Sequence, residues 1–230
     1  MQTKKVNGYI LVEGEIGAGK TTMCHEIARA TGWIEVKEPV ADHPYLEEYY
    51  KRPKELAYIT QKWTQHVRGG AMFTAGLNYR DRGLVSILDR GLPGDWAFAY
   101  ANWKLGNMSE AEWNLYEEDL ECFWKVHIPP TAIIHVDVDT PVLMQRIRKR
   151  GRGMEDGITA EYLELLKEGL SMSLTKYAER FNVPILRVSN NRWCLLEDLN
   201  YDVYQGDGKM VETPASKLHE HVEGRLMVCE

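Results

Sequence analysis

The sequence predicts an α/β fold, in which a five-stranded parallel sheet is flanked by helices. Two observations support it. Short apolar runs of strand length recur along the chain, and longer segments rich in helix-forming residues separate them. Apolar strands that alternate with helices are typical of parallel sheets, because their strands are buried on both faces. The predicted strands are residues 9–13, 33–36, 84–88, 131–138 and 183–188.

The segments between these strands predict the helices. Residues 21–31 have helical spacing and end at Gly32, a residue type that commonly terminates a helix. Pro53 opens a helical stretch that continues toward Tyr79, since proline is tolerated in a first turn. Two further helices are expected between the third and fourth strands.

The periodic pattern fades after Asn191. Residues 207–214 are expected to form a loop, followed by a short helix from about Ala215. A chain of 230 residues is long enough for one large domain, and we expect residues 1–230 to form a single one.

Composition excludes several classes of function. The net charge is −6, from 28 basic and 34 acidic residues, so a broad basic face that neutralises nucleic-acid phosphates is not expected. No apolar run approaches the roughly 18 residues of a membrane-spanning helix. The four cysteines lack paired spacing, which suits reduced thiols in the cytoplasm, without disulfides or structural zinc. These cysteines are Cys24, Cys122, Cys194 and Cys229.

A glycine-rich motif follows the first predicted strand. Residues 14–21 match GxxxxGK[ST] and directly precede a helix, which is the context that a phosphate-binding loop requires. Backbone N–H groups of such a loop surround a phosphate, Lys20 reaches the outer phosphates, and the Thr21 hydroxyl can hold Mg²⁺. The predicted phosphate-binding residues are Gly14, Gly17, Ala18, Gly19, Lys20, Thr21 and Thr22.

The rest of the sequence narrows the class of nucleotide-binding protein. The NKxD motif by which GTPases read guanine is absent from the sequence, and so is the apolar strand ending in Asp-Glu expected of a motor ATPase. A small kinase remains. It would use ATP or another nucleoside triphosphate as donor, with Mg²⁺.

Further motifs follow in a characteristic order. They are Glu38-Pro39-Val40, Tyr49-Tyr50-Lys51-Arg52-Pro53, Gln61, Arg68, Asp89-Arg90-Gly91, Asp95 and the basic segment 146–163. Over residues 9 to about 188 the chain thereby resembles the deoxynucleoside kinase family, in particular its deoxycytidine, deoxyguanosine and deoxyadenosine kinase branch. Residues 190–230 match this family poorly and are interpreted as a C-terminal extension.

The sequence departs from the family pattern in three places. Asp89-Arg90-Gly91 replaces a usual Glu-Arg-Ser, and His43 stands where a tryptophan is usual. Ala99 replaces an expected aromatic residue, with Phe98 beside it. The loop and the Asp-Arg pair also resemble thymidylate kinases, so a nucleoside monophosphate kinase stays an alternative. So does a non-catalytic nucleotide-binding subunit, because the family includes an accessory part of a respiratory complex.

The resemblance implies roles for the residues around the transferred phosphate. Glu38 would be the general base, Arg90 would hold the acceptor hydroxyl, and Asp89 would join Thr21 at the metal. Otherwise Glu38 is a solvated loop residue, and Asp89 and Arg90 form a surface ion pair. The implied catalytic residues are Glu38, Arg90, Lys20 and Arg146.

The basic segment predicts a helical lid. Arg146, Lys149, Arg150 and Arg152 run from a helix into a loop broken by Gly151 and Gly153, which suits arginines that close over phosphates. A basic helix end can also simply complement the helix dipole.

Five residues are assigned to the acceptor nucleoside by the same resemblance. Tyr50 and Glu155 would bind the sugar 3′-hydroxyl. Gln61 and Arg68, seven residues apart on one helix face, would meet the base, with Asp95 as the partner of Arg68. A polar helix face is the plainer interpretation. This pocket favours deoxyadenosine, deoxyguanosine or deoxycytidine over thymidine, and relatives imply a homodimer.

Overall fold

A computed structural model describes residues 6–38, 43–191, 200–204, 210–214 and 217–226. The five predicted strands form the parallel part of a seven-stranded sheet with the order β2-β3-β1-β4-β5-β6-β7. The parallel strands are β1 (Tyr9–Gly14), β2 (Ile34–Val36), β3 (Ser86–Asp89), β4 (Ala132–Asp137) and β5 (Ile185–Ser189). The prediction of a five-stranded parallel sheet is therefore confirmed.

Two further strands extend this sheet. β6 (Asn200–Tyr204) and β7 (Met210–Pro214) form an antiparallel hairpin, and β6 pairs with β5. The expected loop over residues 207–214 is wrong for its last five residues, while residues 207–209 lie outside the described part. A short antiparallel edge strand lacks the continuous apolar run that marks a parallel strand, so its sequence signal is weak.

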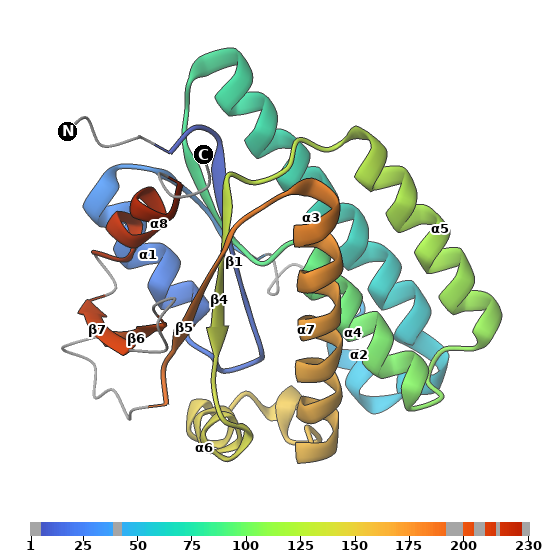
Figure 1. Ribbon diagram of the computed structural model, residues 1–230. Helices are drawn as coiled ribbons and strands as arrows, with labels where there is room; N and C mark the ends of the chain where they lie inside the picture. The colour runs from blue at the N-terminus through green and yellow to red at the C-terminus, as the bar shows by residue number, and fades with distance from the viewer. Residues whose placement is uncertain (1–5, 39–42, 192–199, 205–209, 215–216, 227–230) are drawn as a thin grey trace.

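Helices cover both faces of the sheet (Figure 1). α1 (Lys20–Thr31) and α8 (Leu218–Leu226) lie on one face. On the other lie α3 (Pro53–Arg82), α4 (Leu92–Lys104), α5 (Glu110–Val126) and α7 (Ala160–Phe181). The predicted helices are thus confirmed, although residues 215–216, where the last one was expected to begin, are outside the described part.

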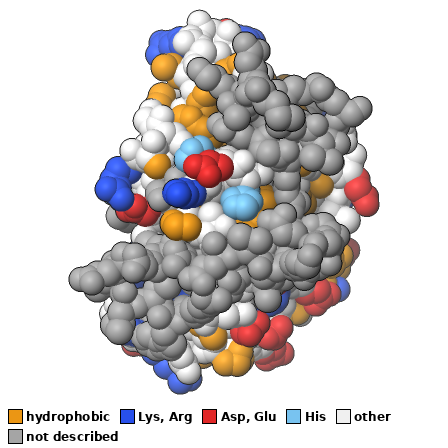
Figure 2. Space-filling model, turned by 60° about the vertical axis from the view of Figure 1, so that its left-hand side comes forward, with side chains coloured by type: hydrophobic (Ala, Val, Ile, Leu, Met, Phe, Trp, Pro, Cys, Tyr) orange, Lys and Arg blue, Asp and Glu red, His pale blue; other side chains and the backbone are white. Residues whose placement is uncertain are grey.

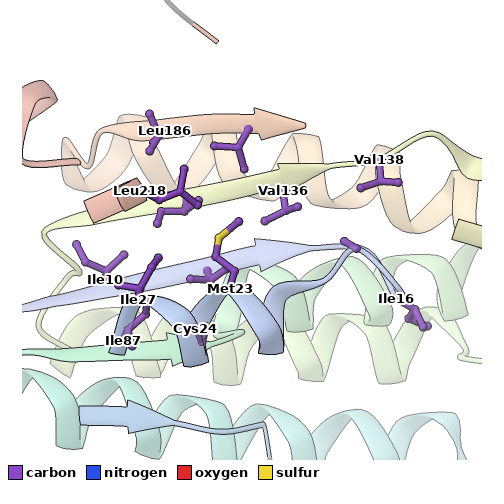
Figure 3. Close-up of a cluster of buried hydrophobic side chains, with 14 of the residues drawn as sticks. Ile10, Ile16, Met23, Cys24, Ile27, Ile87, Val136, Val138, Leu186 and Leu218 are labelled. Atoms are coloured by element: carbon purple, nitrogen blue, oxygen red, sulfur yellow. The ribbon is translucent and has the colours of Figure 1, made fainter. Parts of the chain in front are cut away.

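Alternating residues of β1 explain why the sheet is buried on both faces. Ile10 and Val12 pack with Met23 and Ile27 of α1, and Leu218 of α8 joins the same cluster (Figure 3). Their neighbours Tyr9 and Leu11 instead pack into the cluster beneath α3, α4, α5 and α7. A strand's period of two sends successive side chains to opposite faces, so an uninterrupted apolar run is needed here.

Short elements lie beyond the carboxyl ends of the parallel strands. They are α2 (Leu46–Lys51), α6 (Thr140–Arg150) and the 3₁₀ turn η1 (Gly153–Glu155). Gly151 ends α6 with φ 64°, a left-handed conformation that glycine adopts without a Cβ clash. The chain therefore turns sharply at this glycine, between the basic end of α6 and η1.

On the face shown in Figure 2, the described basic side chains lie in separate small groups beside acidic and apolar ones. Within the described ranges, no helix is both long and apolar enough to cross a membrane. Cys24 is buried and Cys122 exposed, and both are free thiols. Cys194 and Cys229 lie outside the described residues.

Candidate active site

A cavity of about 540 Å³ lies at the carboxyl edge of β1, β2 and β3. Parallel sheets bind ligands at this edge, because the loops that follow neighbouring strands meet there. Fifteen of the predicted site residues line it. They are Gly17, Gly19, Lys20, Thr21, Thr22, Glu38, Tyr50, Gln61, Arg68, Asp89, Arg90, Arg146, Arg150, Arg152 and Glu155.

Three predicted residues do not line this cavity. Gly14 and Ala18 lie beneath it, where a Cβ on Gly14 would stand 2.6 Å from the carbonyl oxygen of Val136. Asp95 is fully buried behind Arg68. Asp95 therefore contacts Arg68 and does not itself line the cavity, and its role in binding the substrate stays a prediction. Pro39 and Val40, from the motif at Glu38, are outside the described residues.

The phosphate-binding loop joins β1 to α1. Gly17 and Gly19 have φ 83° and 95°, left-handed values that a side chain would strain. Lys20 is buried and its Nζ donates to the backbone carbonyl of Glu15 at 2.8 Å. Burial, with a contribution from Arg90, lowers the pKa of Lys20 to about 8. A phosphate in this loop would add negative charge beside that ammonium and favour its protonated form.

Thr21 and Asp89 come together as predicted. The Thr21 hydroxyl donates to Oδ2 of Asp89 at 2.5 Å. Oδ1 of the same carboxylate is buried and makes no hydrogen bond within the described part of the chain. A hydroxyl beside a carboxylate with a spare oxygen is a donor set that suits Mg²⁺. The residues present therefore fit the metal.

Glu38 lies two residues beyond β2, between two arginines. Its Oε1 accepts a hydrogen bond from Nη2 of Arg68 and is 3.1 Å from Nε of Arg90. Burial alone would raise the pKa of Glu38, but Arg90, Arg68 and Lys20 outweigh it and hold the pKa at about 2. The carboxylate is consequently ionised and firmly held.

Arg90 reaches Glu38 from an unusual backbone conformation. It has φ 74°, a left-handed value that is rare for residues other than glycine and costs on the order of 1 kcal/mol. Its N–H still donates to the carbonyl of Val12 at 3.0 Å, so β3 stays paired to β1 up to this residue. The turn directs the guanidinium back over the cavity, where it lies 4.8 Å from the ring centre of Phe98.

Gln61 and Arg68 project from α3 into the same cavity, as their spacing predicts. Nη1 of Arg68 donates to Oδ1 of Asp95 at 2.6 Å, which confirms the predicted pair. The side-chain amide oxygen of Gln61, Oε1, is buried and has no hydrogen-bond partner within the described residues. Phe98 supplies an aromatic ring to this cavity, whereas Ala99 is buried elsewhere. The wall opposite the phosphate loop thus offers an amide, a guanidinium and a ring.

The predicted lid folds back on Glu155. Nη2 of Arg150 is 2.5 Å from Oε2 of Glu155, and Arg152 reaches the other oxygen at 3.5 Å. Arg146 instead donates to the carbonyl of Asn190 at 2.6 Å. Tyr50 lines the cavity together with Glu155, and its burial raises the pKa of the phenol well above the usual range. The lid residues therefore lie at the cavity, where the single carboxylate of Glu155 pairs with both Arg150 and Arg152.

Two buried residues were missed from the sequence. Glu13, near the end of β1, accepts the backbone N–H groups of Gly91 and Gly94, and burial raises its pKa to about 7. Tyr116 of α5 donates to Oδ2 of Asp95 at 2.6 Å. A charged residue ending an apolar strand was a usable signal for Glu13. Tyr116 gave none, because only the fold brings α5 to Asp95.

A phosphate loop that shares one cavity with a carboxylate held by arginines has what phosphoryl transfer to an alcohol requires. Fold and site together define a P-loop kinase. The chain belongs to the deoxynucleoside kinase family, whose sequence model matches residues 10–205. This agrees with the resemblance seen over residues 9–188.

Characterised relatives point the same way. The chain is 35% identical over 168 residues to a deoxyguanosine kinase of Dictyostelium discoideum, a match covering 70% of this chain and 58% of that enzyme. It is 29% identical over 178 residues to a deoxyguanosine kinase of Bacillus subtilis, covering 74% and 80%. A structure of deoxyadenosine kinase from M. mycoides with bound dATP has a TM-score of 0.68 at 28% identity, covering 79% and 90%.

Proposed function

We propose that this protein transfers the γ-phosphate of ATP, or of another nucleoside triphosphate, to the 5′-hydroxyl of a deoxynucleoside. The product would be the 5′-monophosphate, formed in nucleotide salvage. One observation carries the proposal: Glu38 and Arg90, 3.1 Å apart, face the same cavity as the phosphate-binding loop. An alcohol placed there would meet a proton acceptor and a cation next to the donor phosphates.

The residues of the chain divide the chemistry between them. Glu38 takes the proton of the 5′-hydroxyl, and Arg90 keeps the attacking oxygen and the carboxylate in line. Lys20 and Arg146 neutralise charge that develops on the phosphates, while Arg150 and Arg152 close over them. Mg²⁺, held by Thr21 and Asp89, would supply further neutralisation of the phosphate charge.

The acceptor nucleoside would lie against α3 and α4. Gln61 and Arg68 offer donors and an acceptor to the edge of a base, and the Phe98 ring offers a stacking face. A buried guanidinium beside Asp95 disfavours thymine, whose 5-methyl group would displace water without making a hydrogen bond. Deoxyadenosine, deoxyguanosine and deoxycytidine are therefore the proposed substrates, with Tyr50 and Glu155 at the sugar.

The resemblance and the cysteines bear on the oligomeric state and the compartment of the protein. The resemblance to this family implies a homodimer, and we propose one here. Reduced thiols at Cys24 and Cys122 suit the cytoplasm. A single domain is supported by the one continuous sheet and by Leu218 and Val222 of α8, which are buried in the same cluster as β1.

The deciding experiment uses labelled ATP with each deoxynucleoside, and with thymidine monophosphate, in turn. We expect labelled 5′-monophosphates from deoxyadenosine, deoxyguanosine or deoxycytidine and little from thymidine. Transfer to thymidine monophosphate alone would instead identify a thymidylate kinase. Nucleotide binding without any transfer would identify a non-catalytic subunit, a result that the intact set of Lys20, Glu38 and Arg90 argues against.

A further inference from the structure

Arg68 bridges the carboxylates of Asp95 and of Glu38, the proposed general base. Nη1 donates to Asp95 at 2.6 Å and Nη2 donates to Glu38, so one guanidinium holds both. The two acidic residues come from different elements, Asp95 from α4 and Glu38 from the segment after β2. Only 9% of the Arg68 side chain is exposed, so solvent screens these contacts weakly.

The contact with Arg68 opposes the proposed role of Glu38. Arg68 and Arg90 both contact its Oε1, and their positive charges, with that of Lys20, hold the pKa of Glu38 at about 2. A carboxylate so strongly stabilised in its charged form is a poor general base. Glu38 would accept a proton more readily if one arginine left it.

The two ends of the bridge differ in how firmly they are held. Asp95 is fully buried, and Tyr116 donates to its second oxygen at 2.6 Å. Glu38 lines the cavity and its side chain is 18% exposed. The contact between Arg68 and Asp95 therefore stays in place, whereas the contact between Arg68 and Glu38 faces the space that a ligand enters.

The acceptor groups of a nucleobase can compete for that second contact. The cavity wall opposite the phosphate loop includes Nη2 of Arg68 and the side-chain oxygen Oε1 of Gln61. Among the described residues, this oxygen has no hydrogen-bond partner. A base stacked on Phe98 would bring a ring nitrogen or an exocyclic oxygen to Nη2. An acceptor atom that takes the particular Nη2 hydrogen now directed at Glu38 withdraws that hydrogen bond from the carboxylate.

We propose that Arg68 links recognition of the nucleobase to activation of Glu38. An acceptor atom of the base takes the Nη2 hydrogen bond, and Glu38, now held by Arg90 alone, turns to the 5′-hydroxyl. The hydroxyl proton passes to Glu38 as the oxygen bonds to the γ-phosphorus and the bond from phosphorus to the bridging oxygen breaks, releasing the diphosphate. Arg68 is thus a positioning residue for the general base. This inference rests on the proposed function.

The test compares two acceptors that differ only in the base. One is the best natural deoxynucleoside, and the other carries a phenyl ring in place of the base, with the same sugar and 5′-hydroxyl but no acceptor atom. For the wild-type protein at saturating acceptor, we expect kcat to be at least about tenfold lower with the phenyl compound, within the usual range of coupling between two sites. A difference confined to KM would overturn the inference, since the base would then only add affinity.

Variants separate coupling from simple binding. In Arg68→Met, no guanidinium at position 68 holds Glu38. This variant should therefore have the same kcat for both acceptors. With the phenyl compound, its kcat should be higher than that of the wild type. In the control Gln61→Met, which removes a base contact but not the bridge, KM should rise for the natural substrate while the kcat ratio stays as in wild type. If the ratio of kcat values for the two acceptors fell to one in both variants, Arg68 would have no special role in linking the base to Glu38.

Two further outcomes are distinguishable. Should Arg68→Met fold poorly because Asp95 loses its cation, combining it with Asp95→Asn removes that unpaired charge. The double variant must then give equal kcat values for the two acceptors, as expected for Arg68→Met. Failure of the wild type to phosphorylate any deoxynucleoside would overturn the proposed function itself. Normal phosphorylation with equal kcat for both acceptors would overturn only the role of Arg68.

Discussion

The carboxylate of Glu13 accepts a 3.0 Å hydrogen bond from the backbone N–H of Gly94, which joins the end of β1 to the first turn of α4. The same oxygen accepts the N–H of Gly91 at 2.8 Å. These N–H groups belong to a helix start, where four donors lack partners within the helix. Glu13 therefore caps α4 from another element and fixes the helix that carries Asp95 and Phe98.

Replacing Gly94 by alanine should destabilise the protein. An added Cβ would stand 2.1 Å from Oε2 of Glu13, and neither the strand nor the helix can move without breaking the cap. We expect a loss of about 1–3 kcal/mol in the free energy of unfolding, measured with urea. Gly70→Ala is the control, because nothing lies within 4 Å of its added Cβ in α3. That variant should be equally or more stable than wild type by up to roughly 1 kcal/mol.

Glu38→Gln should abolish most of the turnover while leaving nucleoside binding nearly intact. Glutamine keeps an oxygen for Arg68 and Arg90 but accepts a proton poorly. The expected fall in kcat is about two to four orders of magnitude. Steady-state rates and a calorimetric Kd for the nucleoside provide the measurement. Near wild-type turnover at neutral pH would mean that another group accepts the proton.

Arg150→Ala and Arg152→Ala should lower turnover more than they lower affinity for the donor. Both side chains pair with Glu155 here and face charge that develops only during transfer. Lys149→Ala is the matched control, since Lys149 lies in the same basic run but does not line the cavity. It should leave kcat within about twofold of wild type. Loss of ATP affinity with unchanged kcat would mark the two arginines as ordinary phosphate binders.

Thymidine phosphorylation should rise when Arg68→Met and Asp95→Ala are combined. The pair occupies the side of the cavity where the 5-methyl group of thymine would lie, and the double change leaves an apolar wall. Each single change strands one buried charge and should mainly destabilise the protein. The ratio of kcat/KM for thymidine to that for a purine deoxynucleoside tests this. A wild-type protein that already phosphorylates thymidine as well as a purine would contradict it.

The buried carboxyl group of Glu15 should lower the free energy of unfolding as the pH rises. Both of its carboxylate oxygens are buried without hydrogen bonds among the described residues, and burial raises its pKa from 4.5 to about 7. The folded state therefore holds this proton more tightly than the unfolded state, so stability falls between about pH 4.5 and pH 7, by about 3 kcal/mol at most. Glu15→Gln should be more stable than wild type at about pH 8 and should lose this advantage near pH 5. Urea unfolding curves of both proteins at both pH values provide the measurement. If the difference in unfolding free energy between Glu15→Gln and wild type were the same at both pH values, this prediction would be wrong.

The features that the sequence predicted well are those encoded by local patterns. The phosphate-binding loop, the five apolar strands and the pairing of Gln61 with Arg68 on one helix face follow from spacing alone. Asp89 and Arg90 reach the cavity because strand ends meet at one edge of a parallel sheet.

The features that were missed depend on contacts between distant segments. Tyr116 meets Asp95 only because α5 packs against α3 and α4. Phe98 rather than residue 99 faces the cavity because of the rotation of α4, which its nearly uniformly apolar sequence does not determine. The hairpin of β6 and β7 has too few apolar residues to stand out from a loop.

The hairpin of β6 and β7 changes where the sheet ends. Without it, β5 would present a row of unpaired backbone N–H and C=O groups, and such an edge invites strands from other molecules. Pairing of Val188 with Val203 and of Ser189 with Asp202 covers the carboxyl end of that row. None of the described residues of the extension lines the cavity, so the extension acts on the fold: its hairpin covers part of the β5 edge, and Leu218 and Val222 of α8 pack in the core. A chain shortened at residue 191 should therefore aggregate on expression even though every residue assigned to the chemistry is still present.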